Sequence, residues 1–202
     1  MKKIMFNDRY GLTEAVLKGR KTMTRRIVQQ GVLDYYLYEA EDPTIIDAAK
    51  YEIGEIVAVA QRYKDIPSIA DVNFVDADLE RALKNTPFGK WGCANKLKGW
   101  NNKMFVRADL MPHQIRITDI KVQYLQDISN EDCLKEGIRL YGGNGNSSKD
   151  FPLYGFDDYE KKIFHNYATP RETFANLIDK VSGKGTWDSN PYCFCYEFEL
   201  ID

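Results

Sequence analysis

The segment GRKTMTRR, near the start of the chain, places an amine and a hydroxyl three positions apart, at Lys21 and Thr24. Three arginines flank this pair: Arg20, Arg25 and Arg26. A threonine hydroxyl attacks a carbonyl only when a neighbouring base takes its proton, and a lysine is such a base when burial or nearby cations lower its pKa. The same residues would also suit a phosphate clamp or a plain basic edge strand. The segment alone leaves these three interpretations open.

The local pattern places the segment where a helix gives way to a strand. The preceding residues, RYGLTEAVLKG, have apolar side chains at helical spacing, and Gly19 supplies a stop. The following residues, TMTRRIVQ, alternate with period two, which predicts a strand. In a regular strand Lys21 and Thr24 would point to opposite faces. Joint chemistry therefore requires a bend near Lys21–Thr22.

Composition sets limits on the class of protein. A chain of 202 residues with 44% hydrophobic and 29% charged residues predicts one globular domain with embellishments. No apolar run approaches the roughly 20 residues of a spanning helix, and the opening MKKIMFNDRYG lacks a signal-peptide core, so we expect a cytoplasmic protein without a membrane partner. The formal net charge of -2 implies that any nucleic-acid contact is local, as in KGRKTMTRR.

Cysteine and histidine usage gives no metal signature. The chain has four cysteines and two histidines, without a CxxC pair or an HExxH motif, so we expect neither a metal nor another cofactor. Cys193 and Cys195 lie two apart in an apolar stretch, which on a strand points both thiols to one face. We interpret them as small buried hydrophobes in a reducing compartment.

The remaining patterns predict an α+β chain with about five or six strands and three or four short helices. Strands are expected in GEIVAVAQRY and YCFCYEFELID, and two more in MFVRADLMPHQIRITDIKVQYL, interrupted at Met111–Pro112. Helices are expected in DADLERALKN, after an N-cap at Ser129 and after an N-cap at Thr169 with Pro170 behind it. We interpret YGGNGNSSKDFPLYGFDD as a loop. A small β-barrel is the architecture that this order favours.

The order of four segments resembles the ASCH domain family, in particular its phage-related bacterial branch. The segments are GRKTMTRR, a GE-led apolar strand, IRITDIKVQYLQDISNEDCLKEGI after an MP pair, and WDSNPYCFCYEFEL near the end. The resemblance covers the first 28 residues, about 54 to 63, 104 to 138 and 170 to 202. It implies a single PUA-like domain over residues 1–202, a small β-barrel with flanking helices and insertions near 29–53, 64–103 and 139–165.

The resemblance also implies a function. Members of the superfamily are implicated in RNA binding, and one bacterial group is similar to amidohydrolases that remove the acetyl group of N4-acetylcytidine. By motif position the catalytic lysine of that group falls on Lys21, its threonine on Thr24 and its glutamate on Glu136 in LKEGI. Thr24 would be the nucleophile, Lys21 the base, and Glu136 a proton relay or an orienting group.

Two functions follow, with a nucleoside, a nucleotide or RNA as the partner. One is hydrolysis of an N4-acylated cytidine-like amide, and the other is a non-catalytic RNA-binding module that uses the same basic cleft. Arg20, Arg25 and Arg26 are the expected ligand-binding cations. Trp91 and Trp100, in the lysine-rich stretch KWGCANKLKGWNNK, are candidates for stacking on bases. A phage-derived protein acting on modified nucleotides is a third, broader interpretation.

Overall fold

The structure is a computed structural model that describes residues 1–38, 45–70, 98–141 and 152–201. The chain divides into two compact units. Unit 1 comprises Met1–Phe6, Ile56–Ile115 and Ile201–Asp202, and unit 2 comprises Asn7–Glu55 and Arg116–Leu200. The chain is α+β, as predicted, and its eight described strands belong to two sheets. The described strands do not close into a barrel, and the assignment of residues 1–202 to one domain stays a prediction.

Unit 1 contains strands β1 (Lys2–Ile4) and β3 (Ile56–Val59), which pair in parallel. Helix α3 (Pro67–Ala70) and 3-10 turns at Tyr63–Asp65, Lys98–Trp100, Lys103–Phe105 and Ala108–Leu110 account for the other described elements of this unit. Its core is a cluster of buried apolar side chains, namely Ala58, Ala60, Tyr63, Ile66, Ile69, Val106 and Met111.

One predicted strand is wrong. We expected two strands around Met111–Pro112, but only the second is present, as β4 (Gln114–Tyr124). The residues expected to form the first strand lie instead in the 3-10 turns at Lys103–Phe105 and Ala108–Leu110. The Asn102 side chain accepts a hydrogen bond from the Met104 amide at 2.9 Å, and such a local bond competes with strand pairing.

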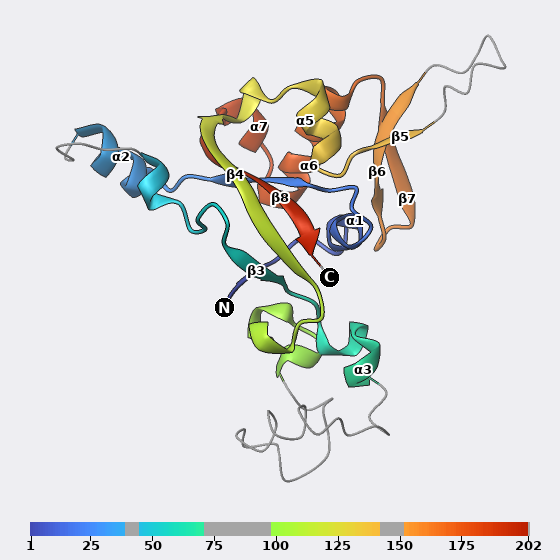
Figure 1. Ribbon diagram of the computed structural model, residues 1–202. Helices are drawn as coiled ribbons and strands as arrows, with labels where there is room; N and C mark the ends of the chain where they lie inside the picture. Colours follow the sequence, from blue (N-terminus) through green and yellow to red (C-terminus); the bar gives the residue numbers. More distant parts are fainter. Residues whose placement is uncertain (39–44, 71–97, 142–151, 202) are drawn as a thin grey trace. The chain divides into compact units, whose positions relative to one another are not determined.

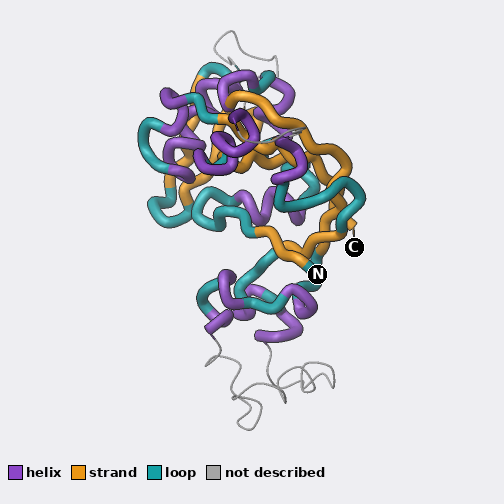
Figure 2. The backbone as a smooth tube through the Cα atoms, turned by 90° about the vertical axis from the view of Figure 1, so that its left-hand side faces the viewer, coloured by secondary structure: helices purple, strands orange, loops and turns teal. Residues whose placement is uncertain are grey.

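Unit 2 holds two groups of strands and most of the helices (Figure 1). In the first group β8 (Tyr192–Ile201) lies between β4 and β2 (Met23–Ile27), and it pairs antiparallel with β2. In the second group β6 (Leu153–Asp158) lies between β5 (Arg139–Tyr141) and β7 (Ile163–Tyr167). The helices are α1 (Leu12–Leu17), α2 (Gln30–Tyr38), α5 (Asn130–Lys135), α6 (Pro170–Ser182) and α7 (Thr186–Ser189), and 3-10 turns occupy Ile45–Ala48 and Leu125–Asp127. In Figure 2 the helical segments of this unit pack around its strands.

The loop interpretation of YGGNGNSSKDFPLYGFDD is wrong for its second half, which forms β6. Gly155 suggested a loop, but in the structure it sits where β7 comes close, since a Cβ there would lie 2.3 Å from the main-chain oxygen of His165. The next residue, Phe156, is buried and stacks on His165 with ring centroids 5.0 Å apart. The glycine therefore marks close backbone packing. The helix expected in DADLERALKN lies outside the described residues.

The two capped helices of unit 2 are confirmed. The Ser129 hydroxyl accepts a hydrogen bond from the Asp132 amide at the start of α5, and the Thr169 hydroxyl accepts one from the Glu172 amide at the start of α6. Helix α6 buries Phe174, Leu177 and Ile178 on its inner side. The Ser129 cap fixes the start of the short helix that carries Asp132 and ends at Glu136.

Removing the α6 cap should lower stability. We expect Thr169→Ala to reduce the free energy of unfolding by about 1 kcal/mol, because the Glu172 amide loses its acceptor. Urea unfolding followed by circular dichroism measures the change. Thr169→Ser keeps the acceptor and should lie close to the unaltered protein. Equal losses in both variants would contradict the capping role.

Candidate functional site

The chain turns sharply between α1 and β2, at the start of the GRKTMTRR segment. Gly19 adopts φ 66°, and the amides of Arg20 and Lys21 both donate to the Ala15 carbonyl, at 2.8 and 2.9 Å. The Thr22 amide then donates to the Lys135 carbonyl of α5 at 2.9 Å. Lys21 consequently belongs to a turn and not to the regular strand, which begins at Met23.

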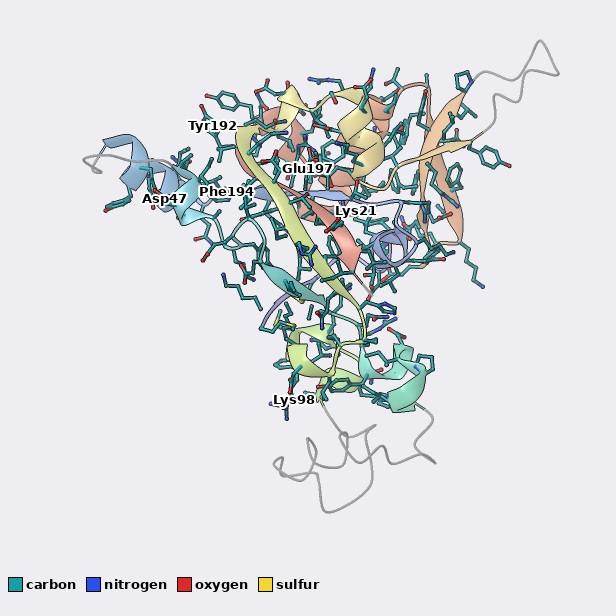
Figure 3. The ribbon with its side chains drawn as sticks, viewed as in Figure 1. Lys21, Asp47, Lys98, Tyr192, Phe194 and Glu197 are labelled. Atoms are coloured by element: carbon teal, nitrogen blue, oxygen red, sulfur yellow. The ribbon has the colours of Figure 1, made fainter. Side chains whose placement is uncertain are left out.

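The Lys21 side chain points into unit 2 and meets Glu136. Its Nζ lies 2.6 Å from Glu136 Oε2 and donates a second hydrogen bond of 2.8 Å to the Glu136 main-chain oxygen. The two residues are 115 positions apart in the sequence. Their side chains are only 1% and 6% exposed. Figure 3 shows Lys21 inside the outline of unit 2, between α1 and β8 in that view.

A second cation, Arg25, joins the same carboxylate. Its NH1 lies 3.1 Å from Glu136 Oε1, and its NH2 lies 3.0 Å from Asp132 Oδ2, with only 1% of the side chain exposed. The guanidinium also stands over the Phe174 ring of α6, 5.9 Å from its centroid. We call Lys21, Arg25, Asp132 and Glu136 the charge cluster. It holds two cations and two carboxylates, so its formal charges balance.

Burial lowers the pKa of Lys21, and the cations Arg26 and Arg25 act in the same direction. The Glu136 carboxylate opposes this shift through its charge and its hydrogen bond. The net direction is downward because the amine has lost almost all of its water. A buried amine with a lowered pKa is the kind of group that serves as a general base.

A glycine makes room for the Lys21–Glu136 contact. Glu136 caps the C-terminus of α5, and the next residue, Gly137, adopts φ 99°. A Cβ on Gly137 would lie 3.4 Å from the Cβ atoms of both Ala15 and Lys21. Gly137 thus combines a left-handed backbone, which favours glycine, with close approach to the turn that carries Lys21.

Thr24 is buried but stands apart from the charge cluster. It lies opposite Tyr196 in the β2–β8 pair and is 4% exposed. Because side chains alternate along a strand, Thr24 faces away from Met23 and Arg25. Its hydroxyl makes no hydrogen bond to any residue within the described ranges, Lys21 and Glu136 included. The structure therefore brings Lys21, Arg25 and Glu136 together. Thr24 is close to Lys21 and Arg25 in the sequence but makes no hydrogen bond to the charge cluster.

The other expected ligand residues fall in different places. Arg20 and Arg26 are exposed, so they differ from the buried Arg25. Trp100 belongs to unit 1, where its partly buried side chain packs against the core cluster. Trp91 lies outside the described residues. Base stacking by Trp100 stays a prediction.

The buried cysteines are not candidates for nucleophilic chemistry. Cys133, Cys193 and Cys195 are free and buried, which confirms the prediction made for Cys193 and Cys195, while Cys93 lies outside the described ranges. Burial raises the pKa of Cys133 and Cys193 to about 12 and that of Cys195 to about 11. These thiols stay protonated near neutral pH, and a protonated thiol is a poor nucleophile.

Metal and membrane partners each require a recognisable feature of the chain. Within residues 1–38, 45–70, 98–141 and 152–201, no group of three or more His, Cys, Asp or Glu side chains is arranged to hold a metal ion. None of the helices in the described part of the chain has the length and apolar character needed to cross a membrane.

Asp132 is the site residue that the sequence analysis missed. Its main-chain amide does pair with Ser129, but its carboxylate holds Arg25. A signal for this role was present, because Asp132 and Glu136 are four positions apart and share one face of a short helix. Two acidic side chains on one buried face indicate a cationic partner.

Comparison with known proteins found no matching family model, no matching curated protein and no matching solved structure. We therefore infer function from the residues of this chain. Its firmest feature is the buried contact between Lys21 and Glu136, which joins the turn after α1 to the end of α5.

Loss of the Glu136 charge should destabilise the protein strongly. Glu136→Gln leaves Lys21 and Arg25 buried without their shared carboxylate, which should cost about 3–5 kcal/mol in the free energy of unfolding. Adding Lys21→Met should restore part of this loss, because it removes the buried cation whose carboxylate partner has been neutralised. Urea unfolding of the two single variants and the double variant measures the coupling.

A surface pair in the same unit provides the control. Glu197 lies 3.4 Å from Lys135, with side chains 27% and 43% exposed. Glu197→Gln should change the free energy of unfolding by less than about 1 kcal/mol. If Glu136→Gln cost no more than this surface variant, the buried pair would not be the interaction described above.

Proposed function

We propose that Lys21, Glu136 and Thr24 form the active site of an ASCH-type amidohydrolase that acts on an N4-acylated cytidine-like nucleoside. The observation that carries the proposal is the buried Lys21 amine, 2.6 Å from a Glu136 carboxylate that comes from 115 positions away. These are the positions that the family resemblance assigns to the catalytic lysine and glutamate. The PUA-like barrel topology belongs to the same proposal.

In the first half of the reaction Thr24 is acylated. Its Oγ forms a bond to the acyl carbon of the substrate while Lys21 Nζ takes the hydroxyl proton. The resulting tetrahedral intermediate collapses when the bond between the acyl carbon and N4 breaks. Lys21 returns the proton to N4, so cytidine leaves with a neutral amino group and an ester remains on Thr24.

In the second half water releases the acyl group. A water oxygen attacks the ester carbon as Lys21 takes one of its protons, and the Thr24 oxygen then leaves and receives that proton. The products are the free threonine and the carboxylic acid. Glu136 holds the Lys21 ammonium between transfers through the contact described above.

Reaction requires the Lys21 amine to reach the Thr24 hydroxyl when substrate is bound. The turn before β2 meets this requirement better than a regular strand, because Lys21 precedes the first alternating residue, Met23. Catalytic hydrogen bonds often tighten only in the substrate complex. The lowered pKa of Lys21 supports this arrangement.

Thr24→Ala should abolish turnover of N4-acetylcytidine while leaving its binding close to unchanged. The variant removes the attacking oxygen and little else, since Thr24 makes no hydrogen bond to other described residues. Chromatographic detection of cytidine measures turnover, and calorimetry measures binding. Thr24→Ser retains a hydroxyl and should keep measurable activity. Absence of cytidine with the unaltered protein, in an assay where a known amidohydrolase is active, would rule the proposal out.

A second candidate is a non-catalytic RNA-binding module, which the exposure of Arg20 and Arg26 favours. These two arginines can reach phosphates, whereas the buried Lys21 and Arg25 are already paired with carboxylates. Such a module would bind a single-stranded oligoribonucleotide without changing it.

Arg26→Ala should then weaken RNA binding and reduce its dependence on salt concentration by about one released counterion. Fluorescence anisotropy over a range of salt concentrations measures both effects. Thr24→Ala is the control and should leave the affinity unchanged. An affinity that is insensitive to both salt and Arg26 would eliminate the RNA-binding candidate.

A further inference from the structure

The Glu136 carboxylate has two cationic partners, one on each oxygen. Lys21 binds Oε2 at 2.6 Å, and Arg25 binds Oε1 at 3.1 Å. The two partners differ in one property, because a lysine amine can lose its proton within a protein whereas a guanidinium stays charged. A carboxylate held by both can therefore lose one ion pair and keep the other.

We propose that Arg25 is a positioning residue that keeps Glu136 in an ion pair when Lys21 is neutral, and that it thereby allows Lys21 to act as a base. The inference rests on the proposed function, in which Lys21 accepts the Thr24 proton. Arg25 touches no reacting atom in that scheme and acts only through Glu136.

The Arg25 guanidinium changes the cost of deprotonating Lys21. If Lys21 were the only cation on Glu136, its deprotonation would leave an isolated carboxylate that is 6% exposed, which is costly. Lys21 would then hold its proton tightly. With Arg25 in place, deprotonation still leaves the Arg25–Glu136 pair intact. The guanidinium therefore reduces the cost of forming the neutral amine.

Arg25 is itself held from a separate direction. Asp132 binds NH2 at 3.0 Å, and the Phe174 ring lies beneath the guanidinium at 5.9 Å. Because Asp132 and Glu136 are one helical turn apart on α5, the planar guanidinium bridges them with two different nitrogens. A lysine at this position has a single charged nitrogen and would bind one of the two carboxylates less well.

Strand β2 and helix α5 both bring charged groups close to Lys21. Strand β2 contributes Arg25 and Arg26, and α5 contributes Asp132 and Glu136. Helix α1 presents Ala15 and Leu12 to Gly137 beside it. The nearest titratable group of β8 opposite Arg25 is the Cys195 thiol, which stays neutral, and α6 contributes the uncharged Phe174.

The test is a titration of Lys21 itself. Protein labelled with 13C-lysine is titrated by NMR, and the Lys21 Cε signal is assigned by its absence in Lys21→Met. Arg25→Gln removes the charge but keeps a hydrogen-bond donor, and it should raise the titration midpoint of Lys21 by about one pH unit or more. Arg25→Lys keeps a charge and should recover at least half of that shift.

Arg26→Met is the matched control, because it removes a cation one position away that is exposed and makes no ion pair with Glu136. Its effect on the Lys21 midpoint should disappear in about 1 M NaCl, where surface charges are screened. The effect of Arg25→Gln should persist there. An unchanged or lowered midpoint in folded Arg25→Gln would overturn the proposal.

If Arg25→Gln does not fold, Asp132→Asn decides the question. Asp132 is 24% exposed and binds a different nitrogen of Arg25 from the one that Glu136 binds. Its neutral analogue removes a negative charge, so it should leave the Lys21 midpoint unchanged or lower it. A raised midpoint would contradict the inference. The titration does not depend on turnover, so absent hydrolysis of N4-acetylcytidine would remove the proposed function and leave the Arg25 result to be read separately.

Discussion

A buried lysine ammonium is stable only beside an opposite charge, and Glu136 provides that charge for Lys21. The arrangement of unit 2 around its candidate site depends on this ion pair. Lys21 and Glu136 meet at 2.6 Å with almost no exposed surface. The contact requires a turn at Gly19, so that Lys21 leaves the strand direction, and a helix end at Gly137, so that Glu136 approaches without a clash. Both glycines adopt the left-handed backbone that such endings favour.

The pairing also explains why the basic segment is not a uniform cationic surface. Of its charged residues, Lys21 and Arg25 are directed into unit 2 and balanced by Glu136 and Asp132, whereas Arg26 stays exposed. Lys21 and Arg25 already form ion pairs with carboxylates and are therefore poor partners for a phosphate. The buried Lys21 amine in the turn and the exposed Arg26 guanidinium on β2 thus have different surroundings.

Helix caps and strand alternation were readable from local sequence because they depend on neighbours within four residues. The caps at Ser129 and Thr169 and the strand that follows Lys21 are all present. The loop predicted around Gly155 is wrong, because this glycine lies where β7 comes close to β6. It was also wrong around Met104, where the Asn102 side chain favours a turn. Neither fact follows from residue type alone.

The sequence by itself determined the α+β class, the ends of the main helices and the set of residue types that could do chemistry. It also required a bend before the strand if Lys21 and Thr24 were to act together. Only the tertiary structure decided that Arg25 is buried on Glu136 and Asp132, and that the Thr24 hydroxyl stands unbonded on the other side of β2. Arg25 and Glu136 are 111 positions apart, so their ion pair depends on how α5 packs against β2. The local periodicity of the sequence contains no information about that packing.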